Sequence, residues 1–102
     1  MTRKIEFEGI GWTEISPSAR SREWIGKGKR IRVLELRPEF EEAGWCARTH
    51  IVHVLVGELE VNFMGEVERL TAGDTAVIAP EDKHKARALT PLARLLLIED
   101  AG

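Results

Sequence analysis

The residues best able to bind a metal are the single cysteine and the three histidines of the chain: Cys46, His50, His53 and His84. Thiolate and imidazole groups both bind zinc, iron, nickel and copper in proteins. The first three of these residues lie within eight positions, whereas His84 lies much further along the sequence. The residue types therefore predict a transition-metal site, provided that the fold brings His84 to the others.

The spacing of these residues limits which of them can share one ion. Residues four apart on a straight strand share a face but lie about 13 Å from each other, so Cys46 and His50 can share a metal only if the chain turns between them. The three residues between them carry no strong turn signal, and the spacing alone leaves this open. His50 and His53 point to opposite faces of a single strand, so they cannot both serve one interior site.

The composition predicts one soluble domain in the cytoplasm. A chain of 102 residues has room for one core, and 43% hydrophobic with 31% charged residues is typical of a globular protein and argues against disorder. The apolar runs are too short for a transmembrane helix, and the first nine residues, MTRKIEFEG, lack the apolar core of a signal peptide. A lone cysteine excludes an intramolecular disulfide and fits a reducing compartment.

The charge balance argues against a nucleic-acid-binding module. Fifteen basic residues face seventeen acidic ones, a net charge of −2, whereas such modules usually carry a basic excess. Residues 20–37 are locally basic, with seven cations against Glu23 and Glu35. This segment can steer an anionic ligand or form a solvated strand face, and the solvated face is the preferred interpretation. The seven cations are Arg20, Arg22, Lys27, Lys29, Arg30, Arg32 and Arg37.

Short apolar segments separated by Gly, Pro and Asp dominate the chain and predict a β-sandwich or barrel. The expected strands are 4–8, 31–37, 50–56, 58–63, 75–79, 84–89 and 92–98. Residues 13–30 are expected to form a long loop or an arm that packs on a partner subunit, and 39–45 allow about one helical turn. The segment 50–56 is apolar on both faces, as in a strand covered on both sides. Three tryptophans, Trp12, Trp24 and Trp45, are expected in the core or at an interface.

Two glycine-anchored stretches between Pro38 and His84 resemble the two sequence motifs of a single-domain cupin. In the first motif, Gly57 matches the closing glycine, His50 stands where the motif has glutamate and Cys46 stands where it has its second histidine. Gly44 occupies the position of the first histidine and offers no ligand.

In the second motif, Gly73 is followed eleven residues later by His84, the spacing that the motif requires. Ala79, Glu81 and Ala88 replace the proline, the inner glycine and the terminal asparagine of the motif.

This resemblance implies an all-β fold, the cupin-type double-stranded β-helix (jelly-roll-like barrel), often assembled as a homodimer with a metal in the mouth of the barrel. The whole chain, 1–102, would form the single barrel, with 1–30 as an N-terminal strand and arm or loop. The metal ligands carried over are Cys46, His50 and His84, which suit a divalent transition metal such as zinc, nickel or iron. Three ligands leave a position open for water or substrate. The competing interpretation is a cupin that has lost its metal.

Two functions fit this interpretation. The first is a small metal-dependent enzyme acting on a small, anionic molecule at the barrel mouth, where Arg48 and Trp45 would contact the substrate; Arg48 is equally well explained as a solvated turn residue. The second is a non-catalytic module that binds a small ligand or senses a metal, and a metal-storage or structural role is a third possibility. No residue is an obvious general base. Glu58 and Glu60 are expected on the outer face of their strand, because Leu59 and Val61 occupy the other face, which points into the interior. No nucleic-acid or membrane partner is expected.

Overall fold

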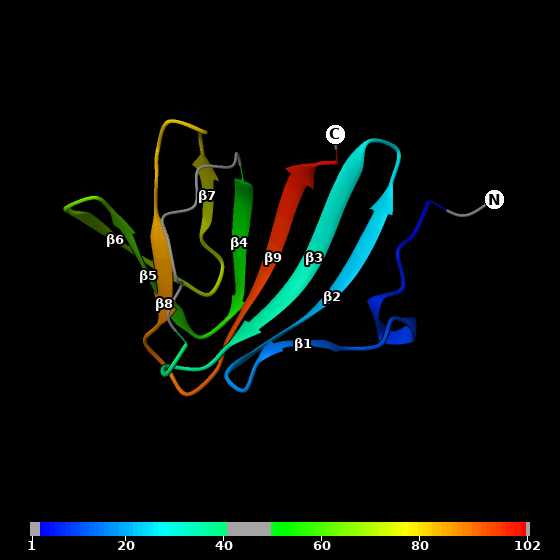
Figure 1. Ribbon diagram of the computed structural model, residues 1–102, viewed down its shortest axis with the longest axis horizontal. Coiled ribbons are helices and arrows are strands. Elements are labelled where there is room, and N and C mark those ends of the chain that lie inside the picture. The colour runs from blue at the N-terminus through cyan, green and yellow to red at the C-terminus, as the bar shows by residue number, and fades with distance from the viewer. Residues whose placement is uncertain (1–2, 41–49, 102) are drawn as a thin grey trace.

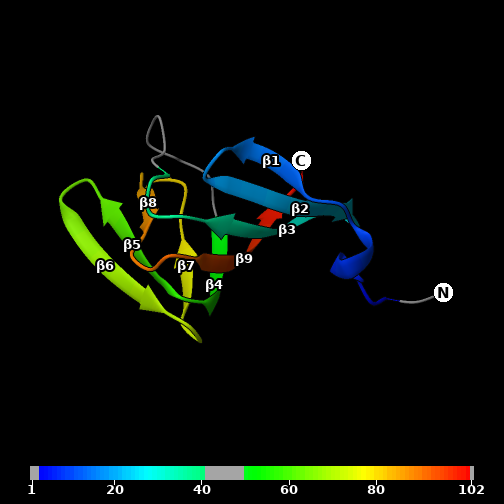
Figure 2. The ribbon, with the colours of Figure 1, turned by 90° about the horizontal axis from the view of Figure 1, so that it is seen from below.

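The computed structural model describes residues 3–40 and 50–101, which form nine β-strands and one short 3-10 helix, η1 (Phe7–Gly9). The strands make two antiparallel sheets that face each other across the core (Figures 1 and 2). In spatial order, the larger sheet contains β1 (Thr13–Ser16), β2 (Ala19–Gly26), β3 (Lys29–Leu36), β9 (Ala93–Asp100), β4 (His50–Val56) and β7 (Thr75–Ile78). The smaller sheet contains β6 (Glu66–Thr71), β5 (Glu58–Phe63) and β8 (Lys85–Ala88). Within these ranges no helix is long and apolar enough to cross a membrane.

The core lies between the sheets because each central strand alternates buried and more exposed side chains. On β9 every second residue, from Ala93 to Leu97, is buried, and on β5 Leu59 and Val61 are buried while Glu60 between them is not. This period of two directs one face of each strand into the molecule. The predicted outward direction of Glu58 and Glu60 is confirmed, since they pair with Arg69 and Arg87 on the outer side.

Two hairpins end in tight turns whose residues have positive φ. Lys27 and Gly28 join β2 to β3 with φ values of 50° and 75°, and Met64 and Gly65 join β5 to β6 with values of 54° and 114°. Two successive positive φ angles match the twist of antiparallel strands. The first turn allows β2 and β3 to pair without interruption from Ala19↔Leu36 to Gly26↔Lys29.

Two predictions about the elements are wrong, and one strand was not predicted. Residues 4–8, expected as a strand, run into η1, and 13–30, expected as a loop or arm, form β1, β2 and the start of β3. The strand β6 was not expected, because its side chains are mostly exposed and it lacks an apolar face. The helical turn expected over 39–45 falls almost entirely outside the described residues.

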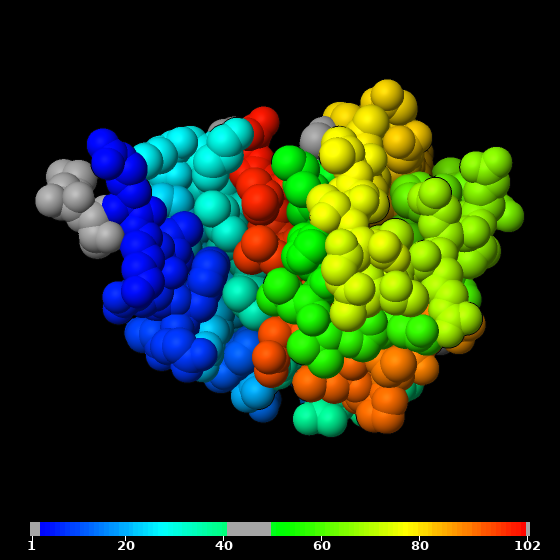
Figure 3. Space-filling view, turned by 180° about the vertical axis from the view of Figure 1, so that it is seen from behind, coloured from blue at the N-terminus to red at the C-terminus, as the bar shows by residue number. Residues whose placement is uncertain are grey.

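The outer face of the larger sheet carries an apolar row across five strands. Directly paired residues share a face, and the pairs Trp24↔Ile31, Ile31↔Ile98, Ile98↔Ile51 and Ile51↔Val77 are continuous. Figure 3 shows β3, β9, β4 and β7 side by side on this surface. Ile51 is 38% and Val77 75% exposed. The expectation that β4 is covered on both sides is therefore not met within the described chain.

Candidate functional site

Two histidines that are distant in sequence meet between the sheets. His50 begins β4 in the larger sheet, and His84 directly precedes β8 in the smaller one. Their ring centroids lie 5.2 Å apart with the ring planes at 88°. Both residues are buried, at 6% and 5% exposure. The fold thus brings together two of the three predicted metal ligands.

The position of His50 follows from strand parity. His50, Val52 and Val54 alternate with the outward residues Ile51 and His53, so the histidine shares the core-facing side of β4. The predicted separation of His50 from His53 is confirmed, since the His53 ring lies on the outer face, where Nδ1 is 2.7 Å from the hydroxyl of Thr75.

The hydrogen bond of His84 selects the tautomer of its neutral ring. Nδ1 lies 3.0 Å from the backbone carbonyl oxygen of Asp82. A carbonyl oxygen only accepts, so Nδ1 carries the proton and the neutral ring has its lone pair at Nε2. Metal-binding histidines commonly use this arrangement, in which one nitrogen is held by an acceptor and the other is available to the metal.

A buried carboxylate lies beside Nδ1 of His50. The Glu99 side chain, 4% exposed, comes from β9, which lies between β3 and β4. Its Oε2 is 3.5 Å from Nδ1 of His50, and its Oε1 accepts a hydrogen bond of 2.6 Å from Nη2 of Arg32. Nη1 of Arg30 is 3.9 Å from the same Oε1. One carboxylate therefore links His50 to two arginines of β3.

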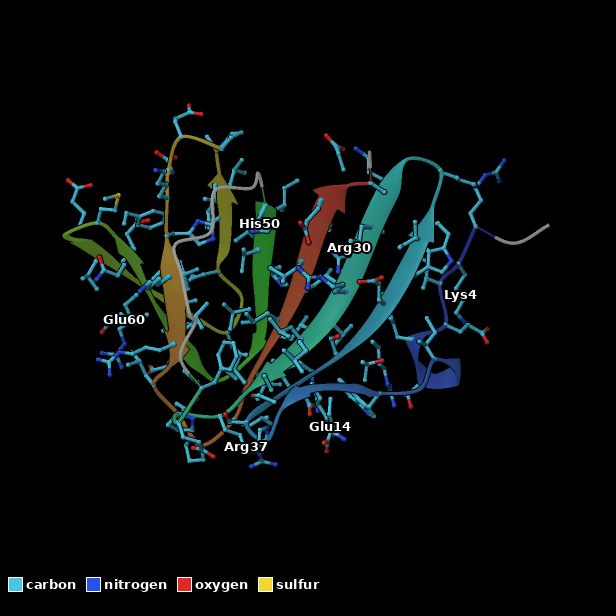
Figure 4. The ribbon with its side chains drawn as sticks, viewed as in Figure 1. Lys4, Glu14, Arg30, Arg37, His50 and Glu60 are labelled. Carbon is cyan, nitrogen blue, oxygen red and sulfur yellow. The ribbon has the colours of Figure 1, made fainter. Side chains whose placement is uncertain are left out.

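A cavity of about 300 Å³ lies against the two histidines and the two arginines. Among the described residues, its polar lining consists of His50, His84, Arg30 and Arg32, and no acidic side chain lines it. Figure 4 shows Arg30 and His50 toward the same end of the larger sheet. The remaining lining is apolar: Ile15, Leu34, Leu36, Phe40, Val52, Leu59, Val61, Ile78, Ala86, Leu95 and Leu97.

The other predicted site residues, Trp45, Cys46 and Arg48, lie outside the described residues, and their roles remain predictions. Across 3–40 and 50–101 no group of three potential metal-binding side chains occurs. The described chain thus supplies an imidazole pair, and the third ligand remains the predicted Cys46.

The two cavity arginines were missed by the sequence interpretation. The preferred prediction of a solvated strand face is wrong for Arg30 and Arg32, whose side chains are 28% and 17% exposed and line the cavity. A signal was present, since positions 30 and 32 have the same parity as the apolar Leu34 and Leu36 on one strand. Glu99 likewise has the same parity as Leu95 and Leu97, but its position between Arg32 and His50 depends on β9 lying between β3 and β4.

Solved structures with the same fold were found, although no protein-family model and no curated protein matches the sequence. KdgF from Halomonas sp. superposes with a TM-score of 0.82 at 19% identity, covering 96% of this chain and 92% of its own. A RmlC-like cupin from Shewanella frigidimarina NCIMB 400 has a TM-score of 0.82 at 17% identity, with 100% and 93% covered.

A third similar structure is the ectoine synthase of P. lautus, with a TM-score of 0.78 at 18% identity and coverage of 97% and 78%. Identities this low establish the fold alone. The predicted all-β, jelly-roll-like cupin architecture is confirmed.

Proposed function

We propose that this chain, which has the cupin fold, is a small metal-dependent protein that acts on a small molecule in the cavity between its sheets. Its metal would be a divalent transition ion, zinc, nickel or iron, held by His50, His84 and Cys46. The observation that carries the proposal is the convergence of the two buried imidazoles at 5.2 Å from opposite sheets.

The residues present fit such an ion. The hydrogen bond of His84 to Asp82 leaves the lone pair of Nε2 available. The carboxylate of Glu99 beside Nδ1 of His50 favours the same tautomer there. Imidazole nitrogens with a thiolate suit the softer transition metals better than magnesium or calcium. A bound ion of this kind would act as a Lewis acid on an oxygen of the ligand.

The chain itself provides an apolar chamber and a cationic wall. Leucine and valine side chains from both sheets give the cavity a mostly apolar lining. Arg30 and Arg32 supply positive charge on one side. The described cavity lining offers only the two histidines for proton transfer, because it contains no carboxylate.

That lack of a lining carboxylate among the described residues favours a second function, ligand binding without turnover. The two functions make different predictions. An enzyme converts its ligand and stops when a chelator removes the metal. A binding module retains the ligand unchanged. The lone cysteine, which must be reduced to bind a metal, supports a cytoplasmic location for either function.

Elemental analysis of the purified chain tests the metal site. We expect about one transition-metal ion per chain, bound as purified or after incubation with zinc, nickel or anaerobic ferrous iron. His50→Ala, His84→Ala and Cys46→Ala should each lose most of this metal. His53→Ala is the matched control, since that ring lies on the outer face and should leave the metal content unchanged.

Two results would contradict the proposal. One is a parent protein that takes up none of the three ions. The other is a metal content that falls in His53→Ala as far as in His84→Ala, which would indicate adventitious binding at surface histidines.

A further inference from the structure

We propose that Arg30 and Arg32 form a carboxylate-binding site in the cavity, and that the ligand of this protein is a small monocarboxylate with an apolar body. This inference rests on the proposed function, because it names the class of ligand for the cavity in which that function places the small molecule.

The two arginines occupy the core-facing side of β3. They alternate with Ile31 and Val33, which lie on the outer face, and precede the buried Leu36 on the inner one. Their guanidinium groups therefore face the cavity next to the histidines instead of bulk solvent.

Arg32 retains hydrogen-bonding capacity. A guanidinium has five N–H donors, and Nη2 of Arg32 donates to Glu99. Its Nε is buried and has no hydrogen-bond partner within the described residues. A buried donor without a partner costs free energy, and the rest of the guanidinium group, whose side chain is 17% exposed and lines the cavity, can still donate to a ligand there. A carboxylate is the acceptor whose two oxygens match the planar fork of arginine.

The charges around the arginines favour a singly charged anion. Glu99 is hydrogen-bonded to Arg32 and lies 3.9 Å from Arg30, and Glu23 accepts a 2.7 Å hydrogen bond from Nε of Arg30. Neither carboxylate lines the cavity. They form ion pairs with the arginines and offset much of the positive charge of the arginines. A phosphate dianion in the cavity would therefore be strongly repelled by Glu99. A monocarboxylate carries a single negative charge and therefore needs less positive charge to balance it.

The rest of the lining indicates the body of the ligand. Apart from the arginines and histidines, every described lining residue is apolar. The volume of about 300 Å³ is at the lower limit of small-molecule sites, about 300–1,000 Å³. An apolar chain or ring with one carboxylate group fits both facts.

Calorimetric titration of the metal-free full chain tests this inference without depending on the metal. The probes are hexanoate and benzoate, with hexanamide and benzamide as neutral counterparts of equal shape and inorganic phosphate as a different anion. We expect saturable binding of at least one carboxylate, with the matching amide and phosphate bound at least tenfold more weakly.

Variants then assign the binding to the arginines. Arg30→Gln and Arg32→Gln should each weaken carboxylate binding about tenfold or more. Arg69→Gln, which removes an exposed arginine paired with Glu58 on the outer side, is the matched control and should have no effect. Glu99→Gln should tighten binding, because it removes the competing carboxylate from Arg32.

Arg32→Gln leaves Glu99 buried without its main partner and can destabilise the fold. The double variant Arg32→Gln/Glu99→Gln avoids that charge and should lose carboxylate binding in the same way.

Several outcomes would overturn the inference. They are failure of both carboxylates to bind, equal binding of carboxylate and amide, preference for phosphate, or unchanged affinity in folded Arg30→Gln and Arg32→Gln/Glu99→Gln. The metal content of the same variants is measured separately. A protein that binds carboxylate but no metal contradicts the proposed function and leaves this inference intact. A protein that binds metal but no carboxylate contradicts this inference and leaves the proposed function intact.

Discussion

Among the described residues, two glutamates of the larger sheet are buried, and arginines pair with each of them on a different face. Glu99 lies inside, between Arg32 and His50. Glu35 lies on the outer face of β3, where Oε1 accepts from Arg20 and Oε2 accepts from Arg94. Burial alone raises the pKa of Glu35, but the hydrogen bonds and charges of Arg20 and Arg94 outweigh it and lower the pKa below its ordinary value of 4.5.

This lowered pKa predicts a stability that falls in acid. A carboxyl group with a depressed folded-state pKa stabilises the fold above its unfolded pKa, and the contribution is lost as pH falls through the folded value. In urea titrations from neutral pH to below 4.5, Glu35→Gln should be roughly 1 kcal/mol less stable than the parent at neutral pH. Its deficit should shrink in acid. A constant deficit at all pH values would contradict the assignment of this effect to Glu35.

The turn between β4 and β5 depends on one glycine. Gly57 has a φ of 81°, and a Cβ placed on it would collide with the carbonyl oxygen of Leu92 and the hydroxyl of Thr90. Thr90 accepts a 3.0 Å hydrogen bond from the backbone of Glu58 and donates to Leu92, so it ties this turn to the segment before β9. The closing glycine of the first motif therefore has a physical role in this chain.

Gly57→Ala should destabilise the protein by roughly 2 kcal/mol or more, because it adds backbone strain and a collision with main-chain atoms. Chemical denaturation followed by tryptophan fluorescence measures this. Gly11→Ala is the matched control, since a Cβ there meets nothing within 4 Å and its φ is not positive. Equal stability of the two variants would contradict the proposed constraint.

Most strands were predictable, and the errors have physical causes. β4 is rich in apolar residues and β5 alternates apolar with polar residues, and both patterns predict a strand. β2 was missed because its outer positions carry charged residues such as Arg20 and Arg22, which stack on Trp12 and do not mark an apolar face. The histidine pair was predicted through motif spacing, whereas Arg32 and Glu99 meet only through strand order, which no local pattern encodes.

At the scale of the whole molecule, the apolar row from Trp24 to Val77 is a surface feature that the cavity does not explain. Exposed apolar patches rimmed by polar residues mark association surfaces, and Arg22 and Thr75 flank this row in the neighbouring register. We propose that a second copy of the chain covers it, in agreement with the homodimer expected from sequence. A two-fold interface needs only a surface complementary to itself, and an unbroken apolar row satisfies that condition.

Light scattering should therefore give twice the chain mass of 11.5 kDa. Ile51→Glu, within the row, should shift the protein to the monomer, because a dimer would bury the new charge. Val67→Glu changes a more exposed apolar residue on β6 of the other sheet and should not alter the mass. A monomeric parent at micromolar concentration would refute the dimer.

The place of β9 has a consequence for biosynthesis. β3 and β4 do not pair with each other, and both pair with β9, which is the last strand of the nine to be made. Until Ala93–Asp100 leaves the ribosome, the nascent chain has two unpaired strand edges, and the carboxylate that bridges Arg32 and His50 is missing. The larger sheet and the site can therefore be completed only after β9 has been synthesised. A chain truncated before β9 would expose strand edges that are prone to aggregation.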